Sequence, residues 1–110
     1  HSGIYGGARS FVTNRLVTYG IECALVRGTG LEAIERQMTD NTRLLFFETP
    51  TNPLLQVLDI REISDWASRH GILTILDNTF ATPINQQLIW WGRPRKAEGG
   101  GPSTPGDSPN

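Results

Sequence analysis

Two carboxylates, Glu48 and Asp77, each follow directly on an apolar run, at 44–47 and 72–76. The segment between these runs has helical spacing, so the order is strand, helix, strand. A right-handed crossover of this kind makes the two strands parallel. Parallel strands end at the same edge of a sheet, and ligands bind beyond that edge in open α/β folds. We therefore expect Glu48 and Asp77 to share the rim of a ligand cleft.

Further polar groups flank Asp77. A carboxylate at the rim of a cleft can pair with a cationic group of a ligand, and Thr79 and Thr82 add hydroxyls close by in the sequence. An Asp that ends a strand is also a common N-cap for whatever follows, so the same residue fits a purely local role. The pattern indicates a site without identifying its ligand.

Two other segments have residues suited to the same ligand. In the loop after the first strand, Asn52 can present its amide to a ligand oxygen, while Pro50 and Pro53 stiffen the backbone. Near the start of the chain, Tyr5 precedes a Gly-Gly pair, and glycines let an aromatic ring lie flat on a planar ligand. Loops rich in Pro and Asn are also ordinary turns.

The first part of the chain is predicted to provide a helix and a strand. Apolar residues three or four apart occupy 8–19, and Gly20 ends that helix. The apolar run 21–26 is typical of a third parallel strand. It carries Cys23, the single cysteine, which we expect to be buried in the strand rather than to act as a nucleophile. One cysteine forms no internal disulfide, which fits a reducing compartment.

Capping signals predict two more helices. Thr29 and Glu32 form a T-x-x-E capping box, in which each side chain satisfies a free amide at a helix start. Met38, further along that helix, is expected to fill the core. Asp59 is a good N-cap for the helix between the two carboxylate-ended strands. Gly71 stands where a left-handed residue ends that helix.

Together these residues resemble a known family. YGG, ETPTNP, D-I-x-x-I and GILTILDNTFATP occur in the order and with the spacing of the pyridoxal-5′-phosphate (PLP)-dependent enzymes of cysteine and methionine metabolism. These transsulfuration enzymes include cystathionine γ-synthase, cystathionine β- and γ-lyases, methionine γ-lyase and homoserine sulfhydrylases. The resemblance covers 5–87. It implies an incomplete α/β domain with parallel strands, part of the three-layer fold-type I large domain of aspartate aminotransferase-like enzymes.

The resemblance implies a cofactor-binding role for five residues. Asp77 would bond the protonated pyridine nitrogen of PLP and keep the ring an effective electron sink. Tyr5 would stack on the face of the pyridine, and Asn52 would sit near the phenolic oxygen of the ring. Thr79 would support the ring beside Asp77. Glu48 would belong to the surroundings of the same pocket.

One part of the family pattern is missing. In the family a further strand leads to a serine-x-threonine-lysine element, whose lysine forms the Schiff base with the cofactor. The only lysine here is Lys96, and its surroundings, RPRKAEGGG, do not resemble that element. Ala8 also stands where the family commonly has Thr. We therefore predict a partial PLP-binding domain over 1–87 and an unrelated, disordered tail over 88–110, as a frameshift would produce. Such a fragment is expected to be inactive alone, with no catalytic residue of its own.

The resemblance also implies partners and a reaction class. The substrate would be an amino acid such as cystathionine, a homoserine ester or cysteine, with a C–S bond formed or cleaved at Cβ or Cγ. The intact protein would be a homotetramer in the cytoplasm. The formal net charge of −1 gives no electrostatic reason to expect nucleic acid. No apolar run approaches the roughly 18 residues of a membrane span, and no cluster of His and Cys indicates a metal site.

Two alternatives remain open from the residues alone. Asp77 in LDNT fits the nucleophile of a phosphohydrolase, although no second acidic residue is evident to help hold Mg²⁺. The chain also fits a non-catalytic remnant that binds a related subunit through normally buried surface. Trp90 and Trp91 would then form part of an exposed apolar patch.

Overall fold

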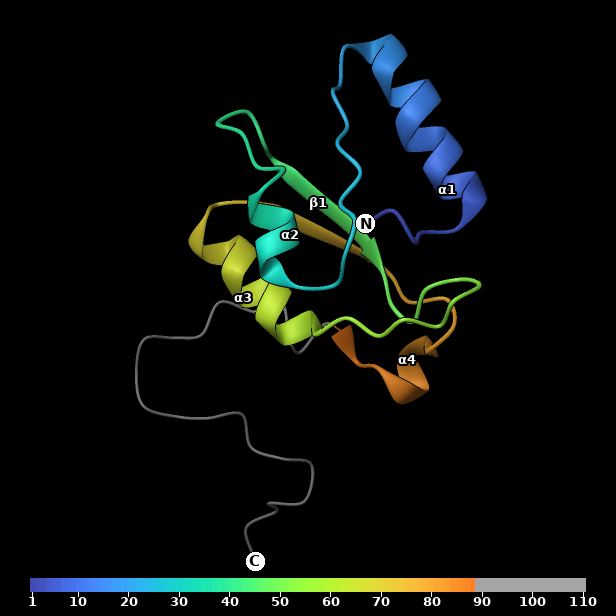
Figure 1. Ribbon diagram of the computed structural model, residues 1–110. Coiled ribbons are helices and arrows are strands. Elements are labelled where there is room, and N and C mark those ends of the chain that lie inside the picture. Colours follow the sequence, from blue (N-terminus) through green and yellow to red (C-terminus); the bar gives the residue numbers. More distant parts are fainter. Residues whose placement is uncertain (89–110) are drawn as a thin grey trace, which may run out of the picture.

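A two-stranded parallel sheet forms the centre of the computed structural model, which describes residues 1–88 (Figure 1). Strand β1 spans Leu44–Glu48 and strand β2 spans Leu73–Asp77. The ladder runs from the pair Leu44–Leu73 to the pair Glu48–Asp77. The predicted parallel pairing is confirmed: β1 has its expected bounds, and β2 begins and ends one residue later than expected.

Helix α3, Ile60–Arg69, is the crossover between the two strands. Asp59 caps it as predicted, because its Oδ1 accepts a hydrogen bond of 2.9 Å from the Glu62 amide. Gly71 follows the helix with a φ of 66°, the left-handed conformation that glycine adopts without strain. The cap and the stop both follow from local chemistry, so sequence alone predicts this helix well.

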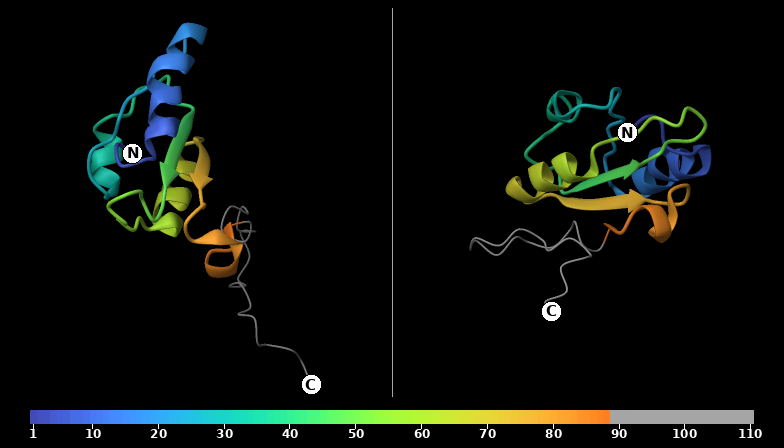
Figure 2. Two further views of the ribbon diagram at one scale, coloured as in Figure 1. Left: turned by 90° about the vertical axis from the view of Figure 1, so that its right-hand side faces the viewer. Right: turned by 90° about the horizontal axis from the view of Figure 1, so that it is seen from below.

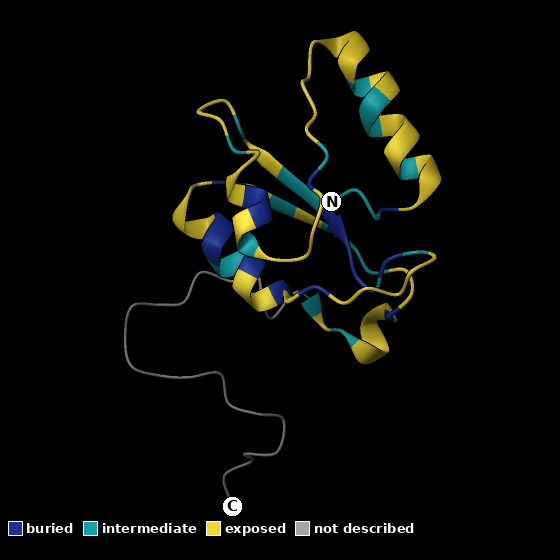
Figure 3. Ribbon diagram, viewed as in Figure 1, coloured by how far each residue is buried: buried dark blue, intermediate teal, exposed yellow. Residues whose placement is uncertain are grey.

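One face of the sheet is packed and the other is open. Helix α2, Leu31–Glu35, and helix α3 cover the same face (Figures 1 and 2). The core lies between these helices and the sheet (Figure 3), and Met38 packs against it as predicted. Its buried members are Val26, Ala33, Ile34, Phe47, Leu58, Ile60, Ile63, Trp66, Ala67 and Ile72. On the opposite face Leu44, Leu73 and Ile75 remain 44%, 65% and 45% exposed.

The predicted strand over 21–26 is wrong within the described part of the chain. The segment is irregular, and its only backbone bond to a distant residue runs from the Ser2 amide to the Val26 carbonyl, at 2.7 Å. An apolar run becomes a strand only when a neighbour supplies a ladder of hydrogen bonds, and β1 does not pair with this segment. Cys23 is accordingly exposed, against the expectation of burial.

The predicted capping box at Thr29 is also wrong. Helix α2 begins one residue later than the box requires, with Gly30 as its N-cap and no side-chain capping bond. Glu32 instead lies 3.9 Å from Arg36 one turn along the helix, with both side chains exposed. Such an exposed pair adds little stability, so α2 is held mainly by burial of Ala33 and Ile34.

A helical segment near the start of the chain stands apart from the sheet (Figures 1 and 2). It comprises α1, Gly6–Ser10, a π-helical turn, Phe11–Arg15, and a 3-10 turn, Leu16–Tyr19. Gly20 ends it with a φ of 75°, as predicted. None of the residues from Gly6 to Tyr19 is buried. The helical segment therefore forms by local propensity, and its position is set by the anchoring of its first residue.

Helix α4, Thr82–Asn85, follows β2 and is the last element described. Leu88, where the tail was expected to begin, still packs against the core. The rest of the predicted tail, with Trp90, Trp91 and Lys96, lies outside the described residues. Over residues 1–88, every helix is too short or too polar to cross a bilayer.

Candidate functional site at the carboxyl edge of the sheet

Glu48 and Asp77 end their strands side by side, which confirms that they share one edge of the sheet. The two carboxylates differ in burial. Glu48 is 6% exposed, whereas Asp77 is only partly buried. The loop after β1 and the segment after β2 both extend beyond this edge (Figures 1 and 2). The edge therefore brings together the loop that carries Asn52 and the segment that carries Thr79.

Glu48 ties the start of the chain to this edge. Its Oε2 accepts a hydrogen bond of 2.6 Å from the backbone amide of Tyr5, which lies 43 residues away in sequence. Tyr5 is the N-cap residue of α1, so the carboxylate satisfies an amide at a helix start. A negative charge at this position is also favourable to the helix dipole. The Tyr5 side chain is left 57% exposed beside the edge.

Asp77 is fixed by Thr79 through a single oxygen. The Thr79 amide donates to Oδ1 of Asp77 at 2.9 Å, and the Thr79 hydroxyl donates to the same atom at 2.5 Å. Within residues 1–88 the other oxygen, Oδ2, accepts no hydrogen bond, so it remains available to a ligand. Thr82 begins α4 and bonds through its amide to the Asn78 carbonyl, and its hydroxyl makes no bond to Asp77.

Asn52 lies in the loop that joins β1 to α3. Its side chain is not joined by a hydrogen bond to Glu48 or Asp77 in the described part of the chain. The loop contains two cis peptide bonds, before Pro50 and before Pro53. Asn52 thus belongs to the loop that extends beyond the carboxyl edge of the sheet (Figure 1).

Two threonines that sequence reasoning missed hold this loop. Thr49 and Thr51 are both fully buried. The hydroxyl of Thr49 accepts from the Leu58 amide at 2.9 Å, and that of Thr51 accepts from the Gln56 amide at 3.0 Å. The sequence contained a pattern that points to such bonds, because Thr residues beside a Pro commonly bond to the nearby backbone through their hydroxyls. Their burial was not readable from sequence.

Asn78 is a second residue that the sequence did not single out. Its Nδ2 donates to the Gln86 carbonyl at 3.2 Å, which closes the segment between β2 and the end of α4. The amide oxygens Oδ1 of Asn78 and Oε1 of Gln86 are buried and have no partner within residues 1–88.

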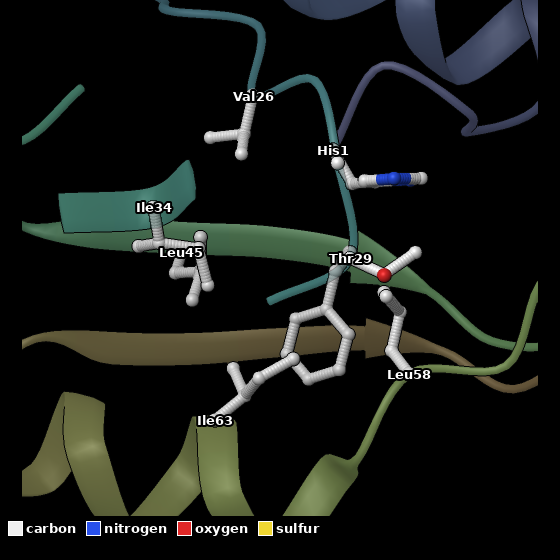
Figure 4. Close-up of a pocket in the computed structure, with 9 residues that line it drawn as sticks. His1, Val26, Thr29, Ile34, Leu45, Leu58 and Ile63 are labelled. Carbon is white, nitrogen blue, oxygen red and sulfur yellow. The ribbon is translucent and has the colours of Figure 1, made fainter. Parts of the chain in front are cut away.

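A small cavity in the core lies away from this edge. It has a volume of about 10 Å³, lies among core side chains such as Val26, Leu45 and Ile63, and has room for about one water (Figure 4). A shallow hollow of about 380 Å³ lies by residues 27–33 at the start of α2, with Arg36 and Glu62 at its rim. Within residues 1–88 no group of three or more His, Cys, Asp or Glu is placed to hold a metal ion.

The carboxylate and the aromatic ring at this edge are groups that could bind a planar heteroaromatic ligand. Within residues 1–88, Oδ2 of Asp77 accepts no hydrogen bond and could accept one from a protonated ring nitrogen, while Thr79 bonds the other oxygen. Tyr5 offers an exposed ring, and its backbone is anchored to the same edge. The fold thus defines a βαβ unit of the α/β class, with Glu48 and Asp77 together at its carboxyl edge.

Comparison with known proteins identifies the family to which this α/β chain belongs. The family model described as "Cys/Met metabolism PLP-dependent enzyme" matches residues 1–93. The chain belongs to this family, whose members depend on PLP. It is 47% identical over 89 residues to a cystathionine beta-lyase of Lactococcus lactis subsp. cremoris and 40% identical over 89 residues to a cystathionine gamma-lyase of Bacillus subtilis (strain 168).

The solved structures agree with the family. The crystal structure of cystathionine gamma-lyase from Lactobacillus plantarum, complexed with L-serine, matches with a TM-score of 0.77 and 38% identity. That match covers 81% of this chain and 23% of the lyase. The match to the Lactococcus enzyme likewise covers 81% of this chain and 23% of the enzyme. The expected fold class is confirmed: the chain holds part of a fold-type I PLP-dependent domain.

Proposed function

We propose that the protein to which this chain belongs is a PLP-dependent enzyme that forms or cleaves a C–S bond at Cβ or Cγ of an amino acid. The observation that carries this is the pairing of Glu48 with Asp77 at one sheet edge, in a chain that matches the family over residues 1–93. Relatives named for cystathionine support cystathionine or a close analogue as the substrate. Family membership decides against the phosphohydrolase alternative.

Four residues of the chain would hold the cofactor, which when bound supplies an electron sink for negative charge developing on the substrate. Asp77 would accept from the ring nitrogen and keep that nitrogen protonated. Thr79 occupies Oδ1 of Asp77, so that Oδ2 would be the oxygen that accepts from the ligand. Tyr5 would cover one face of the ring, and Asn52 would donate to a ring oxygen.

Glu48 would act on the cofactor site indirectly, through Tyr5. Its bond to the Tyr5 amide places the tyrosine at the sheet edge, and the ring follows the backbone. A buried carboxylate is costly unless it is bonded, and this bond offsets part of that cost. We therefore assign Glu48 a positioning role rather than direct contact with the cofactor.

We propose that the 110-residue chain alone binds the ring without catalysing the reaction, because Lys96 is its only lysine and lies outside the family pattern. The longer protein would be a cytoplasmic homotetramer, in which further chain covers the open sheet face carrying Leu73 and Ile75. A non-catalytic remnant that binds a related subunit fits the same exposed face.

Borohydride reduction tests this proposal. The purified chain is incubated with PLP, reduced and analysed by mass spectrometry, and sulfur amino acids are then offered as substrates. We expect no stoichiometric adduct at a defined site and no elimination product. Stoichiometric labelling of Lys96 together with β- or γ-elimination would overturn the claim of inactivity.

A further inference from the structure

Gly7 lies against one side of the Tyr5 ring. A methyl group placed on Gly7 would come within 2.9 Å of Cε1 and 3.3 Å of Cδ1 of that ring. Real Cβ atoms essentially never approach another heavy atom within 3.0 Å, so alanine at this position would force the ring to move. A methyl group on Gly6 would meet nothing within 4 Å. The ring thus rests on the bare Cα of one glycine of the pair and not on the other.

We propose that Gly7 is a positioning residue for Tyr5. The tyrosine is held at two points: Glu48 bonds its backbone amide at 2.6 Å, and Gly7 leaves room for its ring to fold back onto the first turn of α1. The ring then lies against the start of α1, its backbone is anchored to Glu48 at the sheet edge, and Tyr5 keeps an open face because it is 57% exposed. The inference rests on the proposed function only in taking that open face as the surface for a pyridine ring.

The contact, and not the backbone, distinguishes the two glycines. Both belong to α1, and neither has the positive φ that marks Gly20, Gly28 and Gly71. Alanine is therefore compatible with the backbone at both positions and raises helix propensity at both. An effect on the helix would appear in both variants. An effect on the Tyr5 ring is expected only from Gly7→Ala.

Fluorine NMR measures this difference directly. The chain has two tyrosines, so labelling with 3-fluorotyrosine in a Tyr19→Phe background leaves a single probe, at Tyr5. We expect Gly7→Ala to shift the Tyr5 resonance by more than its line width and Gly6→Ala to leave it in place. Far-UV circular dichroism checks that both variants keep their helix content. Equal fluorine spectra for the two variants would overturn the inference.

A ligand titration tests the role in binding. Pyridoxine 5′-phosphate carries the planar ring and the phosphate but no aldehyde, so it reports binding without covalent chemistry. We expect Gly7→Ala to weaken its binding about two- to tenfold relative to Gly6→Ala, the range of one aromatic contact. A shifted resonance with unchanged affinity would show a contact without a positioning role. Absence of binding by the unmodified chain would count against the proposed function, while the fluorine spectra would still decide whether Gly7 places the ring.

Discussion

Glu48 and Asp77 stand opposite one another in the ladder, yet their carboxylates have different tasks. Glu48 is buried and committed to the Tyr5 amide. Asp77 is partly exposed, and Thr79 engages only one of its oxygens. The shared edge thus combines a carboxylate that organises the fold with one that is available to a ligand.

Replacing Asp77 by Asn should weaken binding of pyridoxine 5′-phosphate about ten- to a hundredfold. The substitution keeps the shape and an acceptor oxygen but removes the charge that pairs with a protonated ring nitrogen, and a bond to a charged group contributes about 1.5–3 kcal/mol. Calorimetric titration of the chain measures the affinity. Thr79→Ser, which keeps the hydroxyl, serves as the control and should bind as the unmodified chain does. Equal affinity for the Asn variant would contradict the role of Asp77.

Replacing Glu48 by Ala should release the start of the chain from the sheet. The Tyr5 amide then loses its acceptor, and its hydrogen exchange should accelerate at least about tenfold, because bonds to charged groups contribute about 1.5–3 kcal/mol. Amide exchange followed by NMR gives the readout. Glu48→Gln keeps an acceptor oxygen and should retain most of the protection. If both variants exchange as the unmodified chain does, the bond does not hold Tyr5.

The parts of the fold that sequence predicted correctly depend on local patterns. Helix α3 has a cap at Asp59, an apolar stripe and a stop at Gly71, so its bounds follow from neighbouring residues. Parallel pairing followed from the helix between the two strands, since a helical crossover returns the chain in the same direction. The site edge followed in turn, because two strands that end on carboxylates must bring them together when they are parallel and in register.

The failures concern features that depend on distant partners. The run 21–26 has the composition of a strand, but no described neighbour offers it a ladder, so it is irregular and Cys23 is exposed. The buried hydroxyl of Thr49 was missed because its partner, Leu58, is brought close only by the fold of the loop. Contact between Gly7 and the Tyr5 ring is likewise a matter of side-chain orientation.

Replacing Asp59 by Ala should destabilise the chain by about 0.5–2 kcal/mol, the range for loss of an N-cap. The Glu62 amide loses its acceptor at the start of α3, which packs Ile63 and Trp66 into the core. Urea denaturation followed by circular dichroism measures the change. Arg61→Ala, at an exposed position of the same helix, is the matched control and should change stability by less than about 0.5 kcal/mol. A similar loss of stability in both variants would mean that the Asp59 cap does not stabilise α3.

Replacing Thr49 by Val should cost about 1–3 kcal/mol of stability, because it leaves the Leu58 amide buried without an acceptor. Valine has nearly the shape of threonine, so the fully buried site keeps its packing and loses only the hydroxyl. Thr49→Ser keeps the hydroxyl and should retain the bond, with a smaller loss from the missing methyl group. The hydroxyl also fixes the loop that carries Asn52, so amide exchange across 50–58 should rise in the Val variant and not in the Ser variant. Urea denaturation of both variants measures the loss of stability, and amide exchange measures the protection of residues 50–58. A Val variant as stable and as protected as the Ser variant would show that the loop is held by its prolines and by Thr51 instead.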